Sequence, residues 1–509
     1  MGVKALLVGV SEYPYVEGYP NIHACKNDVL AMKHALIEGL KVSDEDIRVL
    51  GNEMVVLKEM ITDALDEFSI SSCKEDTFIF YFSGHGKEAH LVCSDGFIIM
   101  NELIEKCSSM DYKNSILLFD CCFAGSFVLN EGNLIKIDET LSAHVGKGCA
   151  VMASATASQT SGFVDDERLS CYTGFLYDAM TCKILIRKGR KSLEDINELV
   201  FRFADIWNQK HPDNTQNPVF RSNITGTVYF DVEDYIPYKK ELIYEETEDY
   251  IILDVQPNHN VSTKRYAIKV LLKKPFSFET IAGINREIVN KAKRYEVYDN
   301  PQTEARLSGK PTGIIWCYYG YDESDMTNNN YVCYTTWVDE YNNPEYWYKP
   351  NKYASFIEGV YFWVNPSYLV IKGLQRCTLG NEELIQKTRE CTSNLVNIAN
   401  QYIELFREFK NTTFPETVFV ELVKPLNSEC RRWYFIQSDL PVPPIELHQW
   451  AEAHTMLANT IIDLSLFYDK DNYDKWSADN KKWLLQNTIS NYEKELEKLK
   501  RIDENPIIK

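Results

Sequence analysis

The first 232 residues alternate short apolar segments with amphipathic ones, and this alternation limits the folds that the chain can adopt. The apolar segments have the length of buried strands; they are Val3–Val10, Ile47–Leu50, Thr77–Phe82, Ser115–Phe119 and Cys149–Ser154. Helical periodicity lies between them, at Asn27–Leu40, Val55–Phe68 and Asn101–Cys107. Continuous apolar strands separated by helices form mostly parallel sheets that are covered on both faces. We therefore predict an α/β fold with a mostly parallel central sheet.

Further segments complete this predicted domain. His90–Ile99, with Ser94-Asp95-Gly96 at its centre, has the pattern of a small hairpin. Helices are predicted near Tyr172–Arg187 and Leu193–Gln209, and an extended run follows from Pro218 to Phe230. The acidic, proline-containing stretch DVEDYIPYKKE then indicates a boundary near Asp231–Lys240, so the first domain is predicted over residues 1–232.

The second half of the chain differs in composition and periodicity. Residues 250–375 are rich in tyrosine, tryptophan and β-branched residues, which predicts an antiparallel sheet with long loops. Residues 381–410 and 445–500 have helical periodicity. We predict an α+β region over residues 240–509, with room for more than one domain. Its aromatic segments, such as WCYYGYDE and EYWYKP, are typical of a core or, alternatively, of a surface that binds a regulatory protein partner.

Composition excludes several classes of partner. Lys plus Arg number 54 and Asp plus Glu 74, so the net charge is −20, and the basic surface that nucleic-acid binding requires is not expected. No run of apolar residues is long enough to cross a membrane. The 14 cysteines form no CxxC pairs, which argues against a disulfide scaffold and against a structural zinc site. We predict a cytoplasmic protein with free thiols and no bound metal.

Two of the predicted strands end in residues that can perform chemistry. Thr77–Phe82 leads into YFSGHG, which contains His85, and Ser115–Phe119 leads into DCCFAG, which contains Cys121 and Cys122. Ligands of an open parallel sheet bind beyond the carboxyl ends of its strands, so adjacent strands would bring a histidine and a cysteine together there. A nearby imidazole lowers the pKa of a thiol, and the thiolate attacks acyl carbon. The pattern predicts cleavage of amide bonds.

Each of these features also has an ordinary structural interpretation. A single cysteine in an apolar segment is usually a small buried side chain, and a single histidine is usually a packed or surface residue. The two motifs nevertheless stand at the ends of consecutive strands, 122 − 85 = 37 residues apart. This combination favours catalysis over packing.

The chain resembles the caspase-like cysteine peptidases over residues 1–232, and metacaspases and their bacterial relatives more than animal caspases. The motifs that carry the resemblance are, in order, LLVGVSEY, ACKNDVLAMKHAL, YFSGHG, DCCFAG, ASATASQTS, YTGFLYDAM and QNPVF. The resemblance implies a caspase-like α/β/α sandwich and a cysteine peptidase that acts on protein or peptide substrates. It also implies a role in a regulated stress, defence (including antiviral defence) or cell-death pathway.

The resemblance assigns roles to residues of the two motifs. It implies that His85 is the general base, that Cys122 is the nucleophile, and that the backbone amides of Gly86 and Cys122 form the oxyanion hole. Cys121 is then expected to be a packing residue. The family usually has His-Ser-Gly after the nucleophile, whereas this chain has Phe123-Ala124-Gly125, a change that spares the dyad but alters the adjacent pocket wall.

The same resemblance places Cys25, Asp28, Ser83 and Asp120 in the primary specificity pocket. Two carboxylates in one pocket favour a cationic side chain between them, so cleavage after Arg or Lys is expected. Alternatively, Asp28 is a helix N-cap beside Asn27, and Asp120 is a hydrogen-bonded strand end. Two other functions also stay open: a non-catalytic caspase-like scaffold, and a peptidase that cuts after acidic residues.

No cofactor is expected to be required, although calcium is a candidate activator. The acidic clusters Asp165-Asp166-Glu167 and Asp138-Glu139 offer oxygen ligands but are more typical of solvated loops. Lys136, Lys147 and Arg168 lie in segments that are candidates for self-cleavage.

Overall fold

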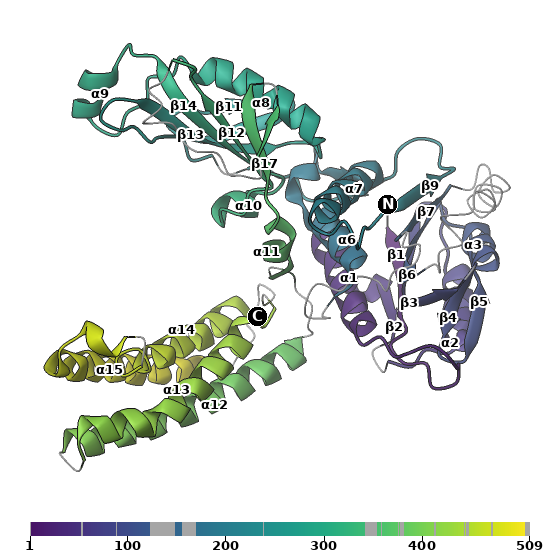
Figure 1. Cartoon of the computed structure of the whole chain (residues 1–509). Helices are drawn as coiled ribbons and strands as arrows, with labels where there is room; N and C mark the ends of the chain where they lie inside the picture. Colours follow the sequence, from purple (N-terminus) through teal and green to yellow (C-terminus); the bar gives the residue numbers. More distant parts are fainter. Residues whose placement is uncertain are drawn as a thin grey trace. The chain divides into compact units, whose positions relative to one another are not determined.

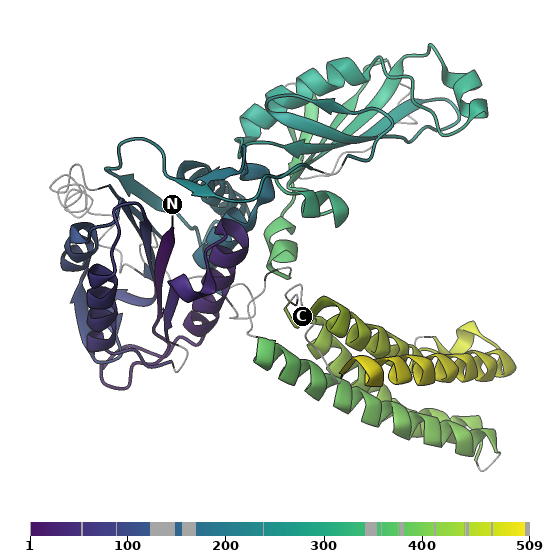
Figure 2. The ribbon, with the colours of Figure 1, turned by 180° about the vertical axis from the view of Figure 1, so that it is seen from behind.

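Figures 1 and 2 show a computed structural model of the chain from two opposite sides. The structure describes residues 2–51, 54–87, 89–122, 148–154, 169–237, 239–341, 354–357, 359–374, 376, 381–411, 414–441, 443, 447–469 and 472–503. The chain divides into two compact units, Met1–Gly373 and Leu374–Lys509.

The first unit begins with the predicted parallel sheet. The strand order is β2-β1-β3-β6-β7-β9, and every neighbouring pair is parallel except β7 and β9. The strands are β1 (Val3–Gly9), β2 (Ile47–Leu50), β3 (Thr77–Lys87), β6 (Asn114–Cys122), β7 (Cys149–Ala153) and β9 (Val219–Ser222). The prediction of a mostly parallel α/β sheet is confirmed.

Helices cover both faces of this sheet, as alternation along β1 requires. Ala5 and Leu7 share one buried cluster with residues of α1 (Ala24–Leu40), α6 (Cys171–Thr181) and α7 (Leu193–Lys210). Leu6 and Val8 belong to the other cluster, with residues of α2 (Lys58–Ile70) and α3 (Met100–Ser109). Successive side chains of a strand point to opposite faces, so β1 contributes to both layers of the sandwich. The predicted hairpin is also present, as β4 (His90–Cys93) and β5 (Gly96–Ile99).

Two predicted segments near the end of this domain differ in the structure. The helix expected over Tyr172–Arg187 ends at Thr181 and is followed by the 3-10 helix η2 (Lys183–Leu185). Lys188 (φ 52°) and Gly189 (φ 71°) then form a left-handed turn that leads into β8 (Arg190–Ser192). The extended run from Pro218 to Phe230 splits between two sheets, because its end forms β10 (Tyr229–Asp231), which pairs with β8.

A second sheet follows within the same unit, and we call residues 245–373 the second sheet domain. Its strand order is β11-β12-β13-β14-β15-β17-β16. The strands are β11 (Glu245–Glu246), β12 (Tyr250–Pro257), β13 (Lys264–Leu272), β14 (Thr312–Gly320), β15 (Cys333–Val338), β16 (Ser355–Ile357) and β17 (Val360–Val364). The sheet is mostly antiparallel, as predicted, but β13 and β14 are parallel. The helices α8 (Phe278–Ala292) and α9 (Pro301–Leu307) lie between these two strands and supply the long crossover that a parallel pair needs.

Two short helices of the second sheet domain matter below. They are α10 (Glu323–Thr327), which follows β14, and α11 (Tyr368–Leu374), which follows β17.

The second unit is helical. Its long helices are α12 (Asn381–Lys410), α13 (Glu416–Ser438), α14 (His448–Leu464) and α15 (Ala478–Asp503). Helices were predicted over 381–410 and 445–500, whereas no helix was predicted where α13 lies. Aromatic and aliphatic side chains from all these helices, such as Phe406, Phe419, Leu457 and Tyr492, form one core. Within the described part of the chain, no helix is long and apolar enough to span a bilayer.

Candidate active site

The histidine and cysteine motifs lie side by side on neighbouring strands. In the parallel pair β3–β6, His85 is the register partner of Cys122, and Ser83 is the partner of Asp120. Neighbouring strands are separated by about 4.8 Å, so the backbones of His85 and Cys122 are adjacent at the carboxyl end of the sheet. The side chain of Cys122 and residues Phe123-Ala124-Gly125 fall outside the described part of the structure.

Tyr13 holds the backbone of His85 in place. The His85 N–H donates to the Tyr13 hydroxyl oxygen (2.8 Å), and that hydroxyl donates in turn to the carbonyl of Val10 (2.9 Å). A Cβ at Gly84 would lie 2.9 Å from the Tyr13 hydroxyl oxygen, so the preceding position has no space for a larger residue. These contacts fix where β3 presents the histidine. Tyr13 was not among the site residues predicted from the sequence, although it is the last residue of the motif LLVGVSEY.

Contacts of the imidazole determine which nitrogen can act as a base. Nε2 of His85 lies 2.8 Å from the carbonyl oxygen of Pro20. A carbonyl can only accept a hydrogen bond, so Nε2 carries the proton and Nδ1 of the neutral ring is the acceptor. Burial lowers the pKa of His85, and the hydrogen bond to Pro20 only partly opposes this effect. The rings of Tyr13 and Tyr19 pack against the imidazole, with centroids 4.8 and 5.3 Å from its centroid.

The two other residues of these motifs have different surroundings. Gly86 is the register partner of Leu91, so β3 continues past His85 into the β4–β5 hairpin. Cys121 is buried in the apolar cluster beneath α2 and α3, together with Phe80 and Phe119. This environment is that of a packing residue.

Asp28 lies inside helix α1, and its carboxylate is almost completely buried, with 1% of the residue exposed. Its Oδ2 accepts a hydrogen bond from Ser83 Oγ (2.6 Å), and its Oδ1 accepts one from the Ser170 N–H (2.9 Å). The alternative that Asp28 is a helix N-cap is wrong, because α1 begins at Ala24 and its N-cap residue is His23. Cys25 stands one turn earlier on the same helix and is also buried.

Asp120 lies on β6 and is 5% exposed. Its Oδ2 accepts hydrogen bonds from the N–H (3.0 Å) and the hydroxyl (2.6 Å) of Thr173, and from the hydroxyl of Ser170. Ser170 therefore bridges Asp28 and Asp120, which we call the acid pair. Neither Ser170 nor Thr173 was among the site residues predicted from the sequence, although Thr173 belongs to the motif YTGFLYDAM and Ser170 lies two residues before it.

Burial dominates the electrostatics of the acid pair. Loss of hydration raises the pKa of Asp28, and the charge of Asp120 raises it further. Burial also raises the pKa of Asp120, against the effect of its hydrogen bonds from Ser170 and Thr173. Two buried carboxyls with one shared neighbour favour a state in which one of them holds a proton. A cation placed between them would favour ionisation of both.

The remaining predicted features lie elsewhere. Among the residues that the structure describes, no three His, Cys, Asp or Glu side chains gather as metal ligands do. The acidic clusters Asp165-Asp166-Glu167 and Asp138-Glu139 fall outside the described ranges. The same is true of the candidate cleavage sites, which are Lys136, Lys147 and Arg168.

Comparison with protein families agrees with the sheet and the motifs. The family model described as "Caspase domain" matches residues 3–229. This part of the chain is a caspase-like domain. The family is one of cysteine peptidases, so the match indicates a protein hydrolase.

Other comparisons add less. No curated protein is similar enough to match the chain. Among solved structures, caspase-1 from Spodoptera frugiperda matches with 13% identity and a TM-score of 0.35, over 45% of this chain and 90% of that one.

Proposed function

We propose that the chain is an endopeptidase in which Cys122 and His85 form the catalytic dyad and which cuts after Arg or Lys. The observation that carries the proposal is the register pairing of His85 with Cys122 at the carboxyl ends of adjacent parallel strands. The caspase-like domain supports the reaction class, because its family cleaves peptide bonds with a cysteine.

In the proposed mechanism, Nδ1 of His85 takes the proton of the Cys122 thiol. The thiolate attacks the scissile carbonyl carbon, and the backbone amides of Gly86 and Cys122 donate to the oxyanion. His85 then gives its proton to the departing amine as the C–N bond breaks, which leaves an acyl group on the sulfur. A water molecule, deprotonated by His85, attacks this thioester and releases the carboxylic acid and the thiol.

The lowered pKa of His85 suits this role. A histidine that stays neutral at physiological pH is available as a base at the start of the reaction. The hydrogen bond from Nε2 to Pro20 would hold the ring in the tautomer that leaves Nδ1 unprotonated. The Tyr13 hydroxyl would fix the backbone that carries the ring.

The acid pair supports the preference for a basic residue. Asp28 and Asp120 offer two carboxylates to one cation, and Ser83 hydrogen bonds to the first of them. Cys25 would line the same pocket from α1. An acidic side chain would be repelled from such a site.

The proposal is tested with fluorogenic peptides that carry Arg, Lys or Asp before the cleavage point. We expect wild type and Cys121→Ala to cleave the Arg and Lys peptides and Cys122→Ala to be inactive. Cys121→Ala is the matched control, because it removes a neighbouring thiol from the same strand. Activity that survives in Cys122→Ala, or wild-type cleavage after Asp alone, would contradict the proposal.

The wider setting of the enzyme also stays a prediction. We place it in the cytoplasm, in a regulated stress, defence or cell-death pathway, with protein substrates and a regulatory partner for the second half. Calcium is a candidate activator, and the peptide assay with calcium or with a chelator tests it directly.

A further inference from the structure

Helix α6 runs between the acid pair and the second sheet domain. Ser170 precedes its first residue and Thr173 stands in its first turn, and these two residues hold both carboxylates. At the other end, the thiol of Cys182 donates to the carbonyl of Tyr321 in the second sheet domain (3.1 Å). The helix has 11 residues, so it is a stiff rod roughly 16 Å long. A shift at one end therefore moves the other.

The side of α6 is joined to the second sheet domain by buried aromatic rings. Phe175 of α6 contacts Phe203 of α7, with ring centroids 6.4 Å apart. Phe203 in turn contacts Tyr321 (6.5 Å) and Tyr368 (6.3 Å), both from the second sheet domain. All four rings are buried and belong to one continuous core. Helix α6 and this domain therefore share one apolar core within the first compact unit.

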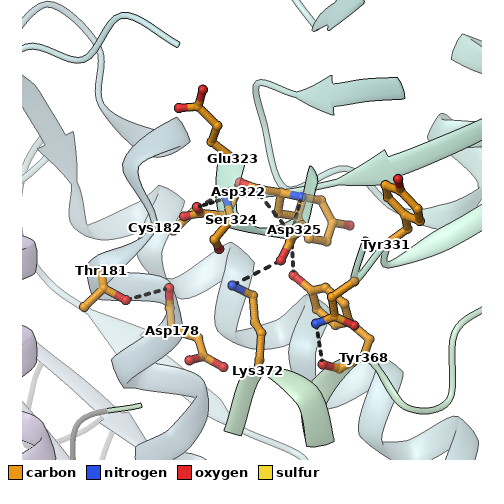
Figure 3. A network of polar contacts seen from close by, with 12 residues as sticks. Asp178, Thr181, Cys182, Asp322, Glu323, Ser324, Asp325, Tyr331, Tyr368 and Lys372 are labelled. Atoms are coloured by element: carbon orange, nitrogen blue, oxygen red, sulfur yellow. Dashed lines mark hydrogen bonds and ion pairs between the residues drawn. The ribbon is translucent and has the colours of Figure 1, made fainter. Parts of the chain in front are cut away.

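A buried lysine adds a charged link to the same interface (Figure 3). Nζ of Lys372, on α11, lies 3.4 Å from Oδ1 of Asp325, whose Oδ2 accepts a hydrogen bond from the hydroxyl of Tyr368 (2.9 Å). Burial lowers the pKa of Lys372, but the charges of Asp325, Asp322 and Asp178 outweigh it and raise that pKa. Asp178 belongs to α6, so the buried ammonium attracts this helix.

The same end of α6 is clamped to α1, the helix that carries Asp28. Nζ of the buried Lys191 donates to the carbonyls of Met180 on α6 and of Gly39 on α1. A Cβ at Gly39 would lie 2.3 Å from the Met180 carbonyl oxygen, so the two helices are in the closest contact that a glycine permits. These contacts thus also fix the position of α6 relative to α1.

We propose that the second sheet domain fixes the position of α6. Ser170 and Thr173 thereby act as positioning residues, which orient Asp28 and Asp120 to bind a cationic side chain. This inference rests on the proposed function, because it assigns the acid pair to substrate selection. Residues 245–373 then contribute to the geometry of the specificity pocket, although they lie outside the caspase-like domain.

Direct variants test the positioning residues. Thr173→Val keeps the shape of the side chain but removes the hydroxyl that donates to Asp120, and Thr173→Ser restores that hydroxyl. We expect Thr173→Val to raise KM for an Arg peptide about tenfold or more, with kcat nearly unchanged, and Thr173→Ser to recover most of the loss. Equal losses in Thr173→Val and Thr173→Ser would overturn this role.

Interface variants test the control by the second sheet domain. Lys372→Met removes the buried ammonium, and Asp178→Asn removes the α6 carboxylate whose charge helps to raise the pKa of that ammonium. We expect each variant to raise KM for the Arg peptide roughly 2- to 30-fold. The double variant should lose less than the product of the single effects, since both remove one attraction. Tyr266→Phe is the matched control: it removes a buried hydroxyl that donates to the Tyr295 carbonyl, within the same domain but away from α6. It should leave KM unchanged.

Two further measurements keep the test decisive. Thermal unfolding separates a misfolded variant from a repositioned helix, and Asp178→Asn replaces Lys372→Met if the latter does not fold. If Thr173→Val changes KM while both interface variants behave like Tyr266→Phe, the inference fails although the proposed function stands. If wild type cleaves no Arg or Lys peptide, the proposed function fails first. Hydrogen exchange of α6 in Lys372→Met then still reports the coupling, and unchanged exchange would overturn it.

Discussion

Replacing Asp28 by Asn tests the charge of the acid pair with little change in shape. Oδ1 of the asparagine would still accept the Ser170 N–H, and its amide would donate to Ser83 Oγ in place of the present O–H···O bond. The variant therefore keeps both hydrogen-bonded contacts and loses only the carboxylate. Any change in selectivity can then be attributed to charge.

The contacts of Asp28 set the expected size of the effect. Removing one partner of a buried ion pair costs about 3–5 kcal/mol, which is roughly 100- to 5000-fold in kcat/KM. The lower end applies here for two reasons. Asp120 remains to receive the cation, and burial with the charge of Asp120 raises the pKa of Asp28, so a proton must leave before the full attraction develops. We expect a loss of about 100-fold for an Arg peptide.

The assay compares peptides with Arg and with citrulline before the cleavage point, because citrulline has nearly the same shape but no charge. Wild type should prefer Arg strongly, and Asp28→Asn should lose most of that preference while its rate on citrulline stays the same or rises. If Asp28→Asn lowers both rates equally, the carboxylate supports the structure and does not select the substrate. That result would refute the reasoning.

Three further predictions concern other groups. Tyr13→Phe removes the oxygen that accepts the His85 N–H, so kcat should fall about tenfold with KM little changed, as steady-state kinetics would reveal. Burial raises the pKa of Asp28 above its ordinary value of 3.8, so the protonated carboxyl contributes to stability at low pH. This contribution is lost as the pH rises through the raised pKa. In urea unfolding at alkaline pH, Asp28→Asn should therefore be more stable relative to wild type than at low pH. In the helical unit, burial lowers the pKa of His454 from 6.5 to about 4, so thermal unfolding should shift to lower temperature as the pH falls through this range, and less so in a His454→Gln variant.

The central sheet could be predicted because its strands carry a signal that few other structures share. Thr77–Phe82 and Ser115–Phe119 are apolar at every position after the first, as expected of strands covered on both faces. Segments with two explanations were less secure. The helix expected to reach Arg187 stops at Thr181, since the backbone leaves helical geometry at Cys182 (ψ 113°), and a turn at Lys188 and Gly189 then leads into β8. No helix was predicted where α13 lies, and this helix contains Pro425, a residue that usually ends or kinks a helix.

The parallel pair in the second sheet illustrates a different limit. Composition indicated strands rich in tyrosine and β-branched residues, but it does not determine the direction in which two strands pair. That direction follows from what connects them, and here α8 and α9 carry the chain from the end of β13 back to the start of β14. No helix was predicted in this connection, which was expected to consist of long loops.

The same distinction applies to the residues of the candidate site. His85 and Cys122 could be paired from the sequence because each follows an apolar strand segment, and the carboxyl ends of adjacent parallel strands lie at the same edge of a sheet. Ser170 and Thr173 have no such marker: hydroxyl residues before and within a helix are common, and their meaning depends on carboxylates from α1 and β6. Their role depends on the position of α6, which is determined by Phe203, Tyr321 and Lys372 from three separate parts of the chain. A pocket whose acids are local but whose hydrogen-bond donors are positioned from a distance can be tuned by changes far from the substrate, and the kinetics of the Lys372 and Asp178 variants measure that tuning.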